Sequence, residues 1–131
     1  MPETKKSIDQ IAEDDGRYDP RALKFVYEGL GVTVQRLRSE EDRGPDEIRH
    51  VTGQELAWGL GHLAVERWGR LARMVLGQWG VRTTRDLGEI VYLMIRHGWM
   101  SAQPEDRIED FDHVFDFETF FEKQFDFELQ A

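Results

Sequence analysis

The stretch that decides the expected fold is residues 78–117, QWGVRTTRDLGEIVYLMIRHGWMSAQPEDRIEDFDHVFDF. Thr83 and Asp86 have the spacing of a helix N-cap and its capping-box partner. Gly98 stands where a residue in left-handed geometry commonly ends a helix. Between them, apolar residues recur at helical spacing and predict one broad buried face: Leu87, Ile90, Val91, Met94 and Ile95.

The segments on either side of this helix predict a winged helix-turn-helix. Gly80 would end a preceding helix over residues 70–79, and two helices joined by a Gly-Val turn are typical of the motif. Trp99 and Met100 then begin a predicted strand, residues 104–110 form a polar loop, and residues 114–117 form the return strand. The expected fold class is therefore mainly α (α+β), with a winged helix-turn-helix-like arrangement and a small β-hairpin wing.

Three further helices are expected before residue 70. Residues 7–14 predict a short helix, and Asp19-Pro20 is a favourable start for a longer one. Two glycines inside that second helix, Gly29 and Gly31, would permit either close packing of a neighbour or a kink. The capping-box sequence TGQE at residues 52–55 predicts the start of the third helix.

The length of 131 residues fits a single domain over residues 1–131. Within it, residues 7–121 are expected to form the core and residues 39–47, which are charged and contain Gly and Pro, a flexible loop. Residues 122–131 are expected to form an acidic-aromatic tail.

Composition points to a cytoplasmic globular protein. The chain has no cysteine, which excludes disulfide and thiol chemistry. No apolar run approaches the roughly 18 residues needed to cross a membrane, and the polar start does not resemble a signal peptide. We therefore expect no membrane association.

The charge distribution is strongly asymmetric. The chain has a net charge of −9. Residues 62–100 contain six Arg against three Asp or Glu, net +3, whereas residues 101–131 contain two basic and ten acidic residues, net −8. A molecule with this net charge should be repelled by nucleic acid and by anionic lipid.

The candidate interaction surface lies around the predicted helix-turn-helix. Arg82, Thr84 and Arg85 occupy the start of the expected recognition helix, and Arg70 and Arg73 lie on the helix before it. In that motif these are the positions that contact bases and phosphates. The alternative interpretation is that these Arg side chains pair with acidic residues or with solvent.

The acidic and aromatic C-terminal end suggests a second kind of contact. Phe125 and Phe127 alternate with acidic residues, a pattern suited to docking into a basic, apolar groove of a partner protein. The competing interpretation is that Phe side chains near the C-terminus complete the core of the domain, and we favour it for Phe115, Phe117 and Phe121.

No catalytic or metal-binding motif is present in the sequence. The four histidines are dispersed, and the pair His62 and Glu66 lacks the HExxH context of a zinc site, so we expect the two side chains to hydrogen-bond on the surface. Nucleophile-elbow, Walker and dinucleotide-binding motifs are also missing from the sequence. We expect no catalytic residue, no metal and no cofactor.

Three motifs occur in this order along the chain: RHVTGQEL at 49–56, LGQWGV at 76–81 with its continuation TRDLGEIVYLM, and EDFDHVFDFETFF at 109–121. Together they resemble a family of small bacterial proteins best known from planctomycete and verrucomicrobial genomes. The resemblance covers roughly residues 7–121. The family has no established activity, so the resemblance implies no role for any residue.

Taken together, these patterns favour a non-enzymatic, winged-helix-like protein-interaction or regulatory adaptor whose protein partner the sequence does not name. The alternative is a nucleic-acid-binding winged helix-turn-helix protein, which the net charge and the acidic residues of the expected wing disfavour.

Overall fold

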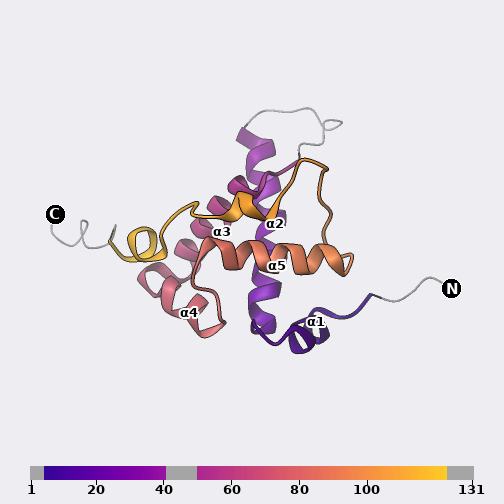
Figure 1. Ribbon diagram of the computed structural model, residues 1–131. Helices are drawn as coiled ribbons and strands as arrows, with labels where there is room; N and C mark the ends of the chain where they lie inside the picture. The colour runs from indigo at the N-terminus through magenta and orange to yellow at the C-terminus, as the bar shows by residue number, and fades with distance from the viewer. Residues whose placement is uncertain (1–4, 41–49, 124–131) are drawn as a thin grey trace.

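The computed structural model describes residues 5–40 and 50–123, and this part of the chain is helical with no β-strand (Figure 1). The prediction of a mainly α fold is confirmed. The α-helices are α1 (Ile8–Asp15), α2 (Pro20–Glu40), α3 (Gly53–Trp68), α4 (Ala72–Gln78) and α5 (Thr84–Arg96). Three short helical segments join or follow them: the 3-10 turns η1 (Gly69–Leu71) and η2 (Ile108–Phe111), and the π-helical segment η3 (Thr119–Lys123).

The predicted helix starts are confirmed by their caps. The hydroxyl of Thr52 accepts the N–H of Glu55, and the carboxylate of Glu55 accepts the N–H of Thr52. Thr83 and Asp86 make the same reciprocal pair at the start of α5. Each box satisfies backbone N–H groups that the first turn of a helix leaves without a partner.

The turn between α4 and α5 has the geometry that its Gly-Val sequence predicts. Gly80 has a φ of 93°, which favours glycine. The N–H of Val81 then donates to the carbonyl of Leu76 at 2.9 Å, and both side chains are buried. This turn fixes how α5 leaves α4.

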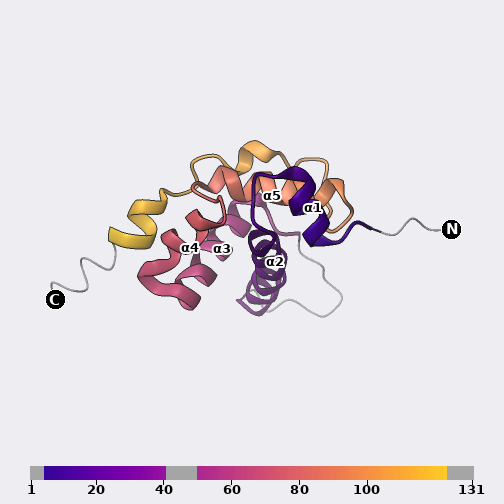
Figure 2. The ribbon, with the colours of Figure 1, turned by 90° about the horizontal axis from the view of Figure 1, so that it is seen from below.

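Helix α5 crosses the long helix α2 (Figure 1), and α3 packs beside α2. Seen from below, α5 and the segment that follows it lie along one side of the molecule, with α2, α3 and α4 on the other (Figure 2). Helices α2, α3, α4 and α5 each contribute large side chains that are almost fully buried, among them Leu23, Val26, Leu60, Leu76, Leu87, Ile90 and Met94.

Gly29 permits close packing of α2 on α3. A Cβ atom at Gly29 would lie 2.2 Å from Cδ2 of Leu60, so any larger residue would force this buried leucine to move. At Gly31 a Cβ atom would meet nothing within 4 Å. Of the two roles left open by the sequence, close packing therefore applies to Gly29.

The predicted β-hairpin wing is wrong. Trp99 follows the C-terminal end of α5, where its backbone N–H donates to the carbonyl of Met94 at 2.9 Å. Its indole N–H donates to the carbonyl of Lys6, also at 2.9 Å. On the other arm of the expected hairpin, Phe117 is buried at the start of a helical turn that continues into η3. Between them the chain makes turns and η2. We call residues 101–117 the C-terminal strap.

Three predicted features fall wholly or partly outside the described residues. These are residues 41–47 of the expected loop, residues 124–131 of the expected tail, and the candidate docking residues Phe125 and Phe127. In the part of the chain that the structure describes, no helix has both the length and the apolar character needed to cross a membrane.

Candidate functional site

The acidic C-terminal region folds onto two of the arginines that the sequence singled out. Nη1 of Arg73 lies 3.0 Å from a carboxylate oxygen of Glu122. Nη1 of Arg85 lies 2.9 Å from Oδ1 of Asp112, and Nε of Arg85 lies 3.0 Å from Glu89. These guanidinium groups are therefore already engaged by carboxylates of the same chain.

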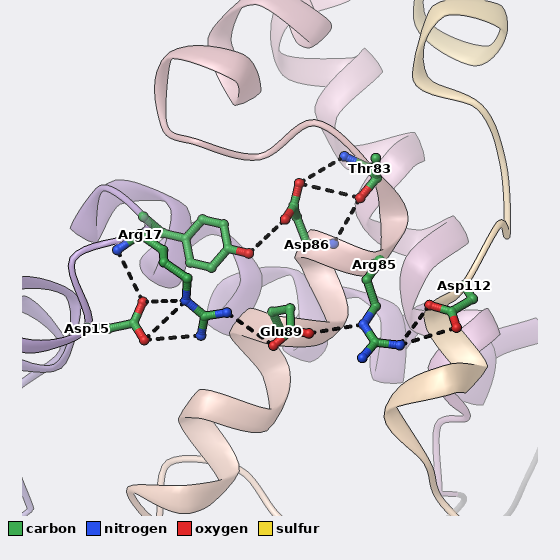
Figure 3. A network of polar contacts seen from close by, with 8 residues as sticks. Asp15, Arg17, Thr83, Arg85, Asp86, Glu89 and Asp112 are labelled. Carbon is green, nitrogen blue, oxygen red and sulfur yellow. Dashed lines mark hydrogen bonds and ion pairs between the residues drawn. The ribbon is translucent and has the colours of Figure 1, made fainter.

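Glu89 stands at the centre of an ion-pair network that joins three distant segments (Figure 3). Its Oε1 accepts Nη1 of Arg17, which comes from the turn between α1 and α2, and its Oε2 accepts Nε of Arg85. Arg17 also pairs with Asp15, and Arg85 reaches Asp112 on the C-terminal strap. The network thus connects the N-terminal helices, α5 and the strap.

The ionisation of these groups reflects their pairing. Hydrogen bonds from Arg85, and then from Arg17, lower the pKa of Glu89 below its ordinary value. The hydrogen bond from Arg17 likewise lowers the pKa of Asp15. The hydrogen bond to Asp112 raises the pKa of Arg85. All of these shifts favour the charged forms, so the network is ionised at neutral pH.

The start of α5 is also occupied by protein groups. Asp86 accepts the hydroxyl of Tyr18 at 2.7 Å through Oδ1 and the backbone N–H groups of Arg82 and Thr83 through Oδ2. Burial, followed by this hydrogen bond, raises the pKa of Tyr18. The N–H groups that could bind a phosphate at this helix end are therefore partly used by Asp86.

Thr84 is buried and forms hydrogen bonds with the C-terminal strap. Its hydroxyl donates to the carbonyl of Phe111 at 2.6 Å and accepts the N–H of Val114 at 3.2 Å. Its side chain is therefore not at the surface. Arg82, in contrast, is exposed, and its guanidinium makes no hydrogen bond or ion pair within residues 5–40 and 50–123.

Two apolar side chains beside the arginines are unusually exposed. Leu71 in η1 is 56% exposed and Met74 in α4 is 54% exposed, and they are three residues apart. Arg70 and Arg73 alternate with them in the sequence and are exposed. We call Leu71 and Met74 the apolar pair.

A cleft of about 430 Å³ lies at the other end of α5, where α2, α3 and the C-terminal strap meet it. One part of its wall is polar. Nε2 of His50 lies 2.6 Å from Oδ2 of Asp106, and the same oxygen accepts the backbone N–H of Gln103 at 2.8 Å. Burial, followed by the charges of Asp106 and Asp110, raises the pKa of the lining Tyr92.

The histidines do not meet in space. In the described part of the chain, no three His, Asp or Glu side chains converge to hold a metal ion. The predicted His62–Glu66 hydrogen bond does not form: both carboxylate oxygens of Glu66 accept Nη2 of Arg36. The ring of His62 instead lies near those of Trp58 and Phe120.

Sequence reasoning missed the cleft and most of the network. His50 and Asp106 are 56 positions apart, and Arg17 and Glu89 are 72 apart. Their residue types gave no local signal, because charged residues occur throughout this chain. A usable signal existed only for Arg85 and Glu89, which are spaced i, i+4 on one helix.

No protein-family model, curated protein or solved structure matches this chain. Function is therefore inferred from the geometry of these side chains.

Proposed function

We propose that this chain is a non-enzymatic protein-interaction adaptor built on a helix-turn-helix-like pair, α4 and α5, with the strap in the place of a wing. The observation that carries the proposal is the exposure of the apolar pair, Leu71 at 56% and Met74 at 54%. Covering the exposed part of each side chain would contribute about 1 kcal/mol. Met and Arg are enriched at the centres of protein interfaces, and two arginines alternate with this pair.

The same surroundings disfavour nucleic acid as the partner. Arg73 and Arg85, which would contact phosphate, are paired with Glu122 and Asp112. A phosphate would have to displace those carboxylates, and the chain's net charge of −9 opposes its approach. A protein partner with an apolar surface meets neither obstacle.

The test compares a variant of the apolar pair with a matched control. Leu71→Gln with Met74→Gln removes the exposed apolar surface without changing charge. Tyr27→Gln is the control, because it also replaces an exposed apolar side chain, which is 40% exposed and lies on α2, without changing charge. Proteins captured from the native host by wild type would be identified and purified, and their binding measured by calorimetry. We expect the double variant to lose at least tenfold in affinity and the Tyr27 variant to keep it. Equal binding by all three would overturn the proposal.

Nucleic acid remains the second candidate because Arg82 is exposed and makes no ion pair in the described residues. A salt-titrated binding assay with duplex DNA and structured RNA separates the two. Under the adaptor proposal, wild type binds at about 10⁻⁴ M or weaker at physiological salt. Sub-micromolar binding that Arg82→Glu abolishes would instead establish the nucleic-acid function. Arg82 is the better probe than Arg85, whose replacement would also break the network of Figure 3.

A further inference from the structure

The cleft at the far end of α5 has an apolar wall large enough for a small molecule. Its volume of about 430 Å³ falls in the range typical of small-molecule sites. The apolar wall comes from three helices and the C-terminal region and includes Leu30, Val34, Leu56, Val91, Met100 and Phe111. Such a wall would favour the aromatic or branched aliphatic part of a ligand.

Asp106 lines this cleft and has one carboxylate oxygen to which no described residue donates a hydrogen bond. Its side chain is only 17% exposed. Oδ2 accepts hydrogen bonds from His50 and from the N–H of Gln103, whereas Oδ1 accepts none from the described residues. A charged donor would form a stronger hydrogen bond to this sheltered carboxylate oxygen than a neutral donor, because charge-assisted hydrogen bonds are about twice as strong as neutral ones.

The other groups around this carboxylate favour a cation over an anion. Asp110 lines the cleft beside Asp106 and adds a second negative charge. Tyr92 also lines the cleft, and its hydroxyl makes no hydrogen bond within the described part of the chain. Of the described residues that line the cleft, two are basic: His50, which is hydrogen-bonded to Asp106, and Arg107, which is exposed, so that solvent screens its charge.

We propose that this cleft binds a small organic amine with an apolar body. The ammonium group donates to Oδ1 of Asp106 and to the hydroxyl oxygen of Tyr92. The apolar body lies against the wall formed by α2, α3 and α5. This site is separate from the apolar pair, and the proposal does not depend on the adaptor function.

Three probes share a 2-phenylethyl body and differ in their polar group: 2-phenylethylamine, 2-phenylethanol and 3-phenylpropionate. Calorimetric titration of the full chain with each probe tests the ligand class. We expect the amine to bind at least tenfold more tightly than the alcohol, and the carboxylate to give no detectable binding. Equal or tighter binding of the alcohol or the carboxylate would overturn the proposal. The lack of any heat from the amine at about 10 mM would also overturn it.

Variants then locate the site. Asp106→Asn keeps the side-chain size and an acceptor for His50 and Gln103 while removing the charge, so the affinity for the amine should fall at least tenfold. Glu105→Gln is the matched control, because Glu105 is the exposed neighbour and does not line the cleft. Its affinity for the amine should be unchanged. An Asp106 variant that folds and binds like wild type would contradict the proposed contact.

A second variant keeps the proposal testable if Asp106→Asn does not fold. Val34→Phe places a larger side chain on α2 that fills part of the cleft and leaves the carboxylate of Asp106 intact. Binding of the amine should therefore be lost. Circular dichroism melting reports whether each variant is folded. Wild-type affinity in a folded Val34 variant would overturn the site. The Leu71 and Met74 double variant should bind the amine normally, which separates this proposal from the adaptor function.

Discussion

The ring of Phe111 lies directly on the backbone of α5 at Gly88. A Cβ atom at Gly88 would be 2.7 Å from both Cβ and Cγ of Phe111, and both residues are buried. Because those atoms are close to the backbone of the strap, a rotamer change at Phe111 cannot remove the clash. The contact fixes the strap against the face of α5 that begins at Thr84.

Gly88→Ala should therefore destabilise the fold. The alanine gains up to about 1 kcal/mol in helix propensity over glycine. The steric cost of an extra methyl group in a tightly packed site is about 1–3 kcal/mol, so we expect a net loss. Chemical denaturation followed by circular dichroism measures the free energy of unfolding.

Gly31→Ala is the control for that measurement. Gly31 also lies within a helix, α2, but a Cβ atom there meets nothing within 4 Å. Alanine at a compatible site stabilises a protein by about 0.4–1 kcal/mol. The two substitutions should thus change stability in opposite directions, and a stabilising Gly88→Ala would contradict the packing of Phe111.

Thr84→Val should cost about 1–3 kcal/mol. Valine keeps the shape of threonine but leaves the carbonyl of Phe111 and the N–H of Val114 without the hydroxyl that each now bonds. Thr84→Ser retains the hydroxyl and loses only a methyl group, so its cost should be smaller. Thermal melting of the two variants gives the comparison, and a Thr84→Ser variant less stable than Thr84→Val would show that the hydroxyl is unimportant.

Opposite faces of α5 should respond differently to truncation. Ile90 is fully buried and Arg96 is exposed. Ile90→Ala should lower the free energy of unfolding by about 2–5 kcal/mol. Arg96→Ala should change it by less than about 0.5 kcal/mol. Urea titration of both variants measures the difference, and similar losses would contradict the amphipathic arrangement.

The helices could be predicted because their signals are local. A capping box of four residues predicts a helix start, as Thr83 with Asp86 and Thr52 with Glu55 do here. Gly80 predicts the end of α4 in the same way, and its φ of 93° in the structure is the left-handed geometry that such a helix end requires. Each feature depends on backbone geometry within one turn, so the rest of the fold does not need to be known.

The sequence could not show that the wing is absent, because the conformation of residues 101–117 depends on contacts with distant residues. Phe115 and Phe117 have high strand propensity, and the alternation around them is typical of a half-buried strand. The structure instead packs these rings with Phe121, and Phe115 also contacts Trp58 on α3. Burial of aromatic area against a helix therefore outweighs local propensity here.

The candidate site was predicted only in part, for the same reason. Arg73 and Arg85 were expected to pair either with phosphate or with acidic residues, and the long-range partners Glu122 and Asp112 lie 49 and 27 positions away. Charge totals for segments suggested that such pairing could form but could not choose the partners. The position of Glu89 between two arginines required the fold itself.

The network around Glu89 should make stability depend on pH. Arg85 and Arg17 lower the pKa of Glu89 in the folded state, so folding favours the ionised carboxylate. The contribution is fully present above the ordinary glutamate pKa of about 4.3. It is lost as pH falls through the lower pKa of the folded state, because the protonated carboxyl no longer pairs with the guanidinium groups.

Glu89→Gln should therefore be less stable than wild type at pH 7. The difference should be smaller at about pH 3, because the contribution of the ionised carboxylate declines once the pH falls below the ordinary glutamate pKa of about 4.3. Urea denaturation at the two pH values measures it. Glu105→Gln is the control, because Glu105 is exposed and makes no ion pair within the described residues. This control should match wild type at both pH values. A stability difference for Glu89→Gln that is equal at pH 7 and pH 3 would mean that the ionised carboxylate does not stabilise the fold through Arg17 and Arg85.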